Sequence, residues 1–373
     1  MFIKIYDKIG RMLNLPNKND GKNTMDNKDQ KHQRRIRYSG THPKTFEAKY
    51  KELQPEKYGD TIKKVIEKGM TPAGMHRPIC VSEILSFLDV KPGQVGLDAT
   101  LGYGGHSLEI LKHLSHQGHL YAVDQDPIEL PRTKQRLENL GYGEDILSVY
   151  NLNFTEIDLI ASVSGKFDFV IADLGVSSMQ IDNPERGFSF KTESPLDLRM
   201  NPTVGICAAD RLKEMTKDEI EGMLIENADE PYASEIATEI TNHYHKGKDI
   251  SLTSDLYKVI TEALKFISSA KRDEEVKKSS QRTFQALRID INREYEVLYD
   301  FLEKLPYVLK PHGKVAILTF HSGEDRLVKK SFQYYFREGI YKEVSDGPIR
   351  PSMDEQSSNS RARSAKLRWA IKA

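Results

Sequence analysis

Short apolar segments alternate with amphipathic ones between residues 95 and 173, and this alternation strongly limits the folds open to the chain. Apolar runs of about four to eight residues are typical of buried strands, and apolar residues spaced roughly three or four apart are typical of helices. Strands that alternate with helices predict parallel βαβ units. We therefore expect an α/β fold with a Rossmann-like, doubly wound sheet that begins with VGLDAT, HLYAVD, SVYN and FDFVIADLG.

The alternation stops after these strands. Residues 181–280 are mostly polar and contain three segments with helical spacing, TKDEIEGMLIEN, YASEIATEITNHYHK and LTSDLYKVITEALKFI. A helix is expected over residues 283–309, followed by the strand KVAILTF, the helix EDRLVKKSFQYYF and the terminal strand KLRWAIKA. The sequence therefore predicts a sheet domain made of residues 75–180 and 281–373, with a helical subdomain of residues 181–280 inserted into it.

Residues 1–74 form an extension ahead of the sheet domain. Its residues 14–40 contain almost no apolar side chain, so we expect the extension to be partly disordered. A solvated tail and an RNA-associated segment both fit this composition. The formal net charge of the whole chain is zero, so any surface for a nucleic acid must come from local clusters. One such cluster ends this polar stretch and consists of Lys28, Lys31, Arg34, Arg35 and Arg37.

The segment DATLGYGGH, from Asp98 to His106, places a glycine-rich turn between a strand and a helix. Glycine lets the backbone approach a ligand closely, and the start of the helix offers free N–H groups. A tight turn without a ligand, a dinucleotide site and an S-adenosylmethionine site all fit this pattern.

Acidic residues at the strand ends favour the methyl donor over a dinucleotide. Asp124 ends the second strand, where a carboxylate can bind ribose hydroxyls, and Asp173 ends the fourth strand. Carboxylates would repel a pyrophosphate, but they attract the sulfonium and ammonium cations of S-adenosylmethionine. The nearby Asp126 precedes Pro127 and is expected to cap the next helix instead.

A series of long motifs follows along residues 75–373: HRPICVSEIL, DATLGYGGHS, AVDQDP, DLGVSSMQ with RGFSF, PLDLRMNP, RTFQALRI, FHSGEDRLVK and NSRARSAKLR. Together they closely resemble the bacterial small-subunit ribosomal RNA cytosine-N4 methyltransferases, the RsmH or MraW family. The resemblance implies a class I methyltransferase domain with a helical insert, S-adenosylmethionine as the cofactor, and ribosomal RNA or the small ribosomal subunit as the partner. The chain departs from the family pattern at Met179, Gly323 and Asn201, and in the extension.

The resemblance also implies which residues bind the donor. It places Asp124 at the ribose and Phe154 beside the adenine, and it adds contacts from Gly104, Gly105, His106, Asp173 and Gln180. By residue type alone, Phe154 would be a core aromatic and Gln180 a surface residue. No metal site is expected, because the histidines at positions 106, 113, 116 and 119 are spread widely around a helix and no cysteine joins them.

The chemistry follows from the target atom. The lone pair of a cytosine N4 amine is delocalised into the ring, so hydrogen-bond acceptors that localise it, together with correct orientation, would speed the transfer. Asp173 and the backbone carbonyls of Leu174 and Gly175 are candidate acceptors, although Asp173 could equally hold only the donor. Methylation at carbon 5 would need a cysteine nucleophile, and neither Cys80 nor Cys207 lies at a strand end.

Two groups of residues are candidates for RNA contact. The C-terminal cluster of Arg361, Arg363, Lys366 and Arg368 could bind phosphates, or could protect an exposed edge strand from aggregation. Arg186, Phe188 and Phe190 of RGFSF could hold a flipped base, although core packing is the simpler interpretation of the two phenylalanines.

Other functions and the setting of the protein stay open. A small-molecule methyltransferase and a non-catalytic RNA-binding assembly factor are the alternative functions. Two cysteines and no apolar run of about 20 residues favour a protein of the reducing cytosol rather than a secreted or membrane protein. The sequence does not fix the oligomeric state, a dimer being one option.

Overall fold

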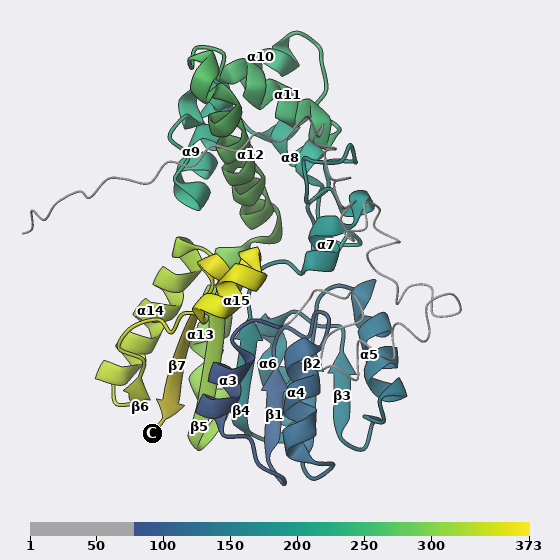
Figure 1. Cartoon of the computed structure of the whole chain (residues 1–373), viewed down its shortest axis with the longest axis vertical. Helices are drawn as coiled ribbons and strands as arrows, with labels where there is room; N and C mark the ends of the chain where they lie inside the picture. Colours follow the sequence, from purple (N-terminus) through teal and green to yellow (C-terminus); the bar gives the residue numbers. More distant parts are fainter. Residues whose placement is uncertain (1–77) are drawn as a thin grey trace, which may run out of the picture. The chain divides into compact units, whose positions relative to one another are not determined.

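The computed structural model describes residues 78–373, so the predictions made for residues 1–74 lie outside the described residues. In the described part, seven strands form one sheet in the order β3-β2-β1-β4-β5-β7-β6 (Figure 1). The first five strands pair in parallel, and β7 pairs antiparallel with both β5 and β6. The α/β fold is thereby confirmed. The strands are β1 (Val95–Asp98), β2 (His119–Val123), β3 (Leu147–Tyr150), β4 (Phe167–Asp173), β5 (Leu309–Thr319), β6 (Tyr341–Val344) and β7 (Lys366–Lys372).

The terminal strand does not lie at the edge of the sheet. β7 is hydrogen-bonded on one side to β5 and on the other to β6, a strand that the sequence did not predict. β6 is only four residues long and only Tyr341 in it is buried, so it carries almost no alternating pattern. The interpretation of the C-terminal basic residues as protection of an exposed edge strand is therefore wrong.

Helices cover both faces of the sheet, and β4 shows why. Its residues alternate between two core clusters, with Phe169 and Ile171 in one and Val170 and Ala172 in the other. The first cluster is completed by α3 (Val81–Leu88), α4 (Gly105–Leu114) and α5 (Glu129–Asn139), and the second by α6 (Ile157–Ser164), α13 (Glu294–Val308) and α14 (Ser322–Arg337). A strand buried on both faces has to be apolar where it is buried, as Phe169, Val170, Ile171 and Ala172 of FDFVIAD are.

A third core cluster lies among helices between β4 and β5. Its buried residues extend from Leu196 to Leu287 and include Ile236, Leu256 and Phe284. The helices are α8 (Ala208–Glu214), α9 (Lys217–Ala228), α10 (Ala233–His245), α11 (Thr253–Ala263) and α12 (Ser269–Asn292). Helix α12 runs across residues 280 and 281, where the sequence placed the end of the inserted subdomain, and that division stays a prediction.

The single helix expected over residues 283–309 is in fact two helices. Arg293 adopts a left-handed conformation with a φ of 49° and separates α12 from α13. Its backbone N–H closes α12 by donating to the carbonyl of Asp290 at 3.1 Å. Helices often end at a left-handed glycine, but here the position is an arginine, so the break could not be predicted from the residue type.

Short helical turns connect these elements near the carboxyl ends of the strands. They are η2 (Phe154–Glu156), α7 (Ser178–Asp182), η3 (Pro184–Arg186), α15 (Met353–Ser358) and η4 (Ser360–Ser364). No helix among residues 78–373 is long and apolar enough to cross a bilayer.

Candidate active site

A cavity of about 700 Å³ opens where β1, β2 and β4 end. Ligands of open α/β sheets bind at the carboxyl ends of the strands, so this is the expected place for a site. Of the predicted donor residues, Gly105, His106, Asp124, Phe154, Asp173 and Gln180 line the cavity. Gly104 does not: it precedes α4 with a φ of 70°, and a Cβ there would lie 2.9 Å from Thr133 Cγ2. Glycine at that position is explained by the turn and its packing.

Asp124 is held firmly by the backbone. Its Oδ2 accepts a hydrogen bond from Gly102 N at 2.6 Å, and its Oδ1 accepts one from Asp126 N at 2.9 Å. Burial raises the pKa of Asp124 to about 6, although these two hydrogen bonds oppose the shift. A carboxylate has about four lone-pair directions, so Asp124 can still accept hydroxyl groups from a ligand.

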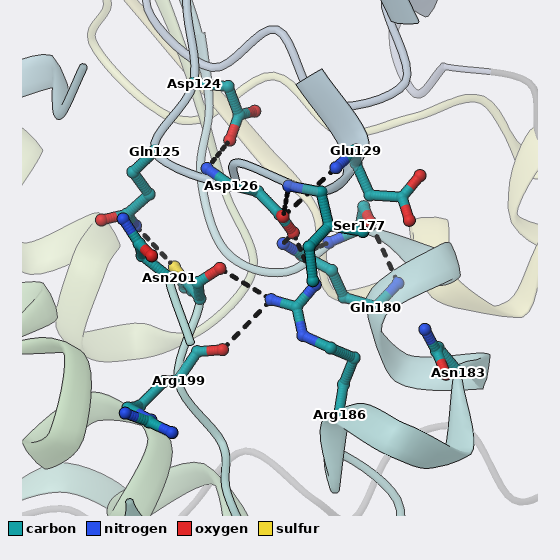
Figure 2. A network of polar contacts seen from close by, with 12 residues as sticks. Asp124, Gln125, Asp126, Glu129, Ser177, Gln180, Asn183, Arg186, Arg199 and Asn201 are labelled. Carbon is teal, nitrogen blue, oxygen red and sulfur yellow. Dashed lines mark hydrogen bonds and ion pairs between the residues drawn. The ribbon is translucent and has the colours of Figure 1, made fainter. Parts of the chain in front are cut away.

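Asp126 caps a helix, as predicted, and also anchors a buried network (Figure 2). Its Oδ1 accepts hydrogen bonds from the backbone of Ile128 and Glu129 as α5 begins, at 2.9 and 3.3 Å. Its Oδ2 accepts one from Gln180 Nε2 at 2.7 Å and one from Arg186 Nη1 at 2.8 Å. The network therefore joins the loop after β2 to the segment after β4.

Arg186 is a structural residue and not an RNA contact. Its side chain is almost fully buried, and its Nη2 donates to the carbonyls of Arg199 and Met200 at 3.1 and 2.7 Å. Figure 2 shows the guanidinium pointing to Asp126 on one side and to these carbonyls on the other. Since the guanidinium is used inside the protein, the proposal that Arg186 holds a flipped base is wrong.

The two phenylalanines of RGFSF pack in the helical core. Phe190 stacks on Tyr257 with ring centroids 5.5 Å apart and meets Phe284 edge-on at 5.6 Å. Phe188 packs against the same cluster. Core packing, the simpler interpretation of the pattern, accounts for both, and the stacking role is corrected accordingly.

Phe154 belongs partly to the core and partly to the cavity. Its ring meets Phe301 edge-on at 5.0 Å and packs against the cluster beneath the sheet, while it also lines the cavity. Gln180 is buried rather than exposed, and its Oε1 accepts a hydrogen bond from Ser177 N at 2.8 Å. Its surface position, expected from residue type, is wrong.

Asp173 and His106 face each other at the cavity wall. Asp173 Oδ2 lies 3.6 Å from His106 Nδ1, and Asp173 Oδ1 has no hydrogen-bond partner among the described residues. Burial, reinforced by the charge of Glu324, raises the pKa of Asp173 to about 7. Burial also lowers the pKa of His106. The cavity thus contains a carboxyl that can gain or lose a proton near neutral pH.

A polar face of α12 lines the cavity and was not predicted. Gln281, Gln285, Arg288 and Asn292 recur at three- and four-residue spacing, which places them on one side of the helix. That spacing is visible in the sequence and could have revealed the face. Arg288 forms a two-point ion pair with Glu294, with distances of 2.7 and 2.9 Å. His321 and Glu324, whose Nε2 and Oε1 atoms lie 3.1 Å apart, complete this wall.

The C-terminal basic cluster divides into two pairs. Lys366 and Arg368 form ion pairs with Asp325 at 3.1 and 2.6 Å, so their proposed role in phosphate binding is wrong. Arg361 lines the cavity and lies 3.4 Å from Asp182, and Arg363 is exposed. These two arginines remain the candidates for phosphate contact.

Neither cysteine has the properties of a nucleophile. Burial, together with the charges of Glu83, Glu355 and Asp173, raises the pKa of the Cys80 thiol to about 12. Burial also raises the pKa of Cys207, which lies just before α8. Because the thiolate is the reactive form, these thiols are unsuited to attack on carbon 6 of a pyrimidine.

Comparison with known proteins gives a consistent result. The family model described as the MraW methylase family matches residues 73–373. "Ribosomal RNA small subunit methyltransferase H 2" of Alkaliphilus metalliredigens is 65% identical over 94% of this chain and 100% of its own length. "Ribosomal RNA small subunit methyltransferase H 1" of Lachnoclostridium phytofermentans is 63% identical over 93% of this chain and 95% of its own length.

A more distant relative differs in how much of the chain it matches. "Ribosomal RNA small subunit methyltransferase H" of Buchnera aphidicola is 38% identical over 80% of this chain and 97% of its own length. An alignment over 94% of the chain must include most of residues 1–74. The extension is therefore shared with some relatives and is not a peculiarity of this chain.

Proposed function

The chain belongs to the MraW methylase family, and on this premise we propose that it methylates the N4 amine of a cytidine in small-subunit ribosomal RNA. The observation that carries the proposal is the partly exposed Asp173 carboxyl at the end of β4, a hydrogen-bond acceptor that lines the acid-rich cavity beside His106. Such an acceptor suits an exocyclic amine, which offers two N–H donors.

The acids of the cavity fit S-adenosylmethionine, the cofactor of this methylase. When bound, it supplies a methyl group on a positively charged sulfur. Asp124 would accept the ribose hydroxyls, and Phe154 would pack against the adenine. Gly105 lines the cavity, and a Cβ there would lie 2.9 Å from Pro78 Cγ, so glycine would let α4 pack closely against Pro78 at the donor site. Gly104 would act by shaping the turn, and Gln180 by holding the wall next to Asp126.

Asp173 would act on the acceptor rather than on the donor alone. A carboxylate that accepts a hydrogen bond from N4–H pushes electron density back onto the nitrogen and orients its lone pair. The raised pKa of the two thiols supports N4 as the target, since methylation at carbon 5 needs a thiolate.

The RNA would enter over the polar face of α12 and the η4 turn. Gln281 and Gln285 offer amides that can contact bases, and Arg361 and Arg363 can contact phosphates. Under this proposal the helices of residues 181–280 form a substrate subdomain inserted into the methyltransferase domain. The protein would work in the cytoplasm, where it meets the small ribosomal subunit.

A labelling experiment separates this function from its alternatives. The protein is incubated with methyl-labelled S-adenosylmethionine and, in parallel, with small ribosomal subunits, large subunits and a protein-free metabolite extract. We expect label only in RNA of the small subunit. Label in a metabolite would establish a small-molecule methyltransferase, and donor binding without transfer to any fraction would favour an assembly factor.

A further inference from the structure

One hydrogen bond to the backbone determines which ring nitrogen of His106 carries the hydrogen. Nε2 lies 3.0 Å from the carbonyl oxygen of Ile79, and a carbonyl can only accept, so Nε2 carries the hydrogen. In a neutral imidazole the other nitrogen, Nδ1, then has a bare lone pair. That lone pair faces Asp173 Oδ2 at 3.6 Å. Two acceptors that face each other are repulsive unless a proton lies on one of them.

The surroundings of the pair are acidic. Asp98 on β1, Glu109 on α4 and Glu355 on α15 act on His106, and Glu324 on α14 acts on Asp173. The Cys80 thiol is also close to Asp173 and is protonated. Arg288 is near Glu324 but is already paired with Glu294. Burial next to so many carboxyls keeps a proton on the pair near neutral pH, while the positive sulfur of the donor would repel it.

We propose that Asp173 and His106 share one proton in the donor-free enzyme, release it when S-adenosylmethionine binds, and regain it from N4 after methyl transfer. This inference rests on the proposed function. Asp173 is the group that touches the substrate, and His106 is a positioning residue that acts through Asp173.

The cycle balances. Binding of the cationic donor expels the proton from Asp173 to solvent. The N4 lone pair then forms a bond to the methyl carbon while the carbon–sulfur bond breaks, and its electron pair stays on sulfur. N4 now carries a positive charge and loses a proton to the Asp173 carboxylate. The sulfur product is neutral, so the pair keeps this proton until the next donor binds, and each turnover releases one proton.

Calorimetry on the donor-free protein tests the inference without any turnover. S-adenosylmethionine is titrated into the enzyme at several pH values, in buffers that differ in ionisation enthalpy, so that the number of protons released is obtained. We expect release of about half a proton per site at pH 7, because a group with a pKa near 7 is half protonated there. S-adenosylhomocysteine, which lacks the positive sulfur, should release clearly less.

Three variants show which residue releases the proton. Asp173→Asn should bind the donor without this release, and His106→Asn should lower the pH at which release occurs, because Asp173 loses its proton-sharing partner. His113→Asn is the matched control, since His113 is an exposed histidine of the same helix, and it should match the wild type. Unchanged release in Asp173→Asn, or no release by the wild type between pH 6 and 8, would overturn the inference.

A second measurement covers the case in which His106→Asn does not fold. Nitrogen-15 NMR of histidine-labelled wild type reports the hydrogen on each ring nitrogen. We expect a neutral His106 with hydrogen on Nε2 across pH 6–8, and a hydrogen fixed on Nδ1 alone would contradict the inference. A wild type that binds the donor without releasing a proton leaves the proposed function intact, whereas a wild type that does not bind the donor refutes the function itself.

Discussion

Single residues at the carboxyl ends of the strands determine what this cavity can bind. Asp124 and Asp173 are both partly buried acids with raised pKa values, of about 6 and about 7. They differ in their partners, since both oxygens of Asp124 accept backbone hydrogen bonds and Asp173 Oδ1 accepts none from the described residues. This contrast supports a fixed binding role for Asp124 and a proton-exchanging role for Asp173.

Replacement of Asp124 by alanine should weaken donor binding at least tenfold. The loss of a charged hydrogen-bond partner costs about 1.5–3 kcal/mol, which corresponds to that change in affinity. Isothermal titration with S-adenosylmethionine measures it, with Asp346→Ala, an exposed acid, as the control. Wild-type affinity in the Asp124 variant would remove this residue from the site.

Replacement of Asp173 by asparagine should stabilise the donor-free protein more at pH 8 than at pH 5. The pKa of Asp173 is about 7 in the folded protein and about 3.9 in an unfolded chain. The folded form therefore binds more protons between these values, and stability is lost as the pH rises through this window. Asparagine does not titrate, so the variant does not lose this stability as the pH rises. Thermal melts of both proteins across this pH range provide the test, and a difference in Tm that does not change with pH would contradict the assignment.

The positions of the acids were predictable, but the partners of the basic residues were not. Strand ends are visible as the last residue of an apolar run, so Asp124 and Asp173 could be placed in one crevice. Arg186 and Arg368 looked like free cations because their partners, Asp126 and Asp325, are distant in sequence. Only the folded chain brings such pairs together.

At the scale of elements, the buried pair of Asp126 and Arg186 fixes how two connections leave the sheet. Asp126 starts α5 after β2, and Arg186 ends η3 and holds the carbonyls of Arg199 and Met200 (Figure 2). The backbone N–H of Met200 donates a hydrogen bond to Asn292 Oδ1 of α12 at 2.7 Å. The segment from Arg186 to Met200 is thus bonded to Asp126 at its start and to Asn292 at its end.

Replacement of Arg186 by methionine should destabilise the protein by about 3 kcal/mol or more, because it leaves Asp126 buried without its cationic partner. Urea unfolding followed by circular dichroism measures this change. The double variant Asp126→Asn with Arg186→Met should recover part of the lost stability, since it buries no unpaired charge. A single variant as stable as the wild type would mean that water reaches Asp126.

Element prediction succeeded where the pattern was long and failed where it was local. The strand FDFVIAD contains a continuous apolar run, helices such as Thr253–Ala263 carry a clear helical period, and the structure contains both. The break at Arg293 and the strand β6 were missed, because a left-handed arginine and a four-residue strand leave almost no mark in the sequence.

At the scale of the whole molecule, the chain combines a complete donor cavity with a segment that precedes it. Every residue proposed to touch S-adenosylmethionine lies within residues 105–180. Relatives that align over 93–94% of the chain share most of the extension. The relative from Buchnera aphidicola aligns over only 80% of the chain and is also named a methyltransferase. We therefore expect the extension to act in the recognition of RNA, with a dispensable solvated tail as the alternative.

A chain that begins at Met70 should fold and bind S-adenosylmethionine normally. Its methylation of ribosomal RNA should weaken through a higher KM, most clearly at high salt, because the basic side chains of residues 28–37 would be lost. Rates measured across a salt series for both proteins provide the comparison. Equal rates throughout would make the extension dispensable, and loss of donor binding would place it in the fold of the donor site.

The identity of the methylated nucleoside shows whether the protein acts on the N4 amine of a cytidine. Small ribosomal subunits are incubated with the protein and S-adenosylmethionine that carries a deuterated methyl group, and the RNA is digested to nucleosides for mass spectrometry against authentic standards. We expect deuterated N4-methylcytidine from wild-type protein, and much less from Asp173→Asn. Deuterium in 5-methylcytidine, in a methylated purine or on a ribose would contradict it.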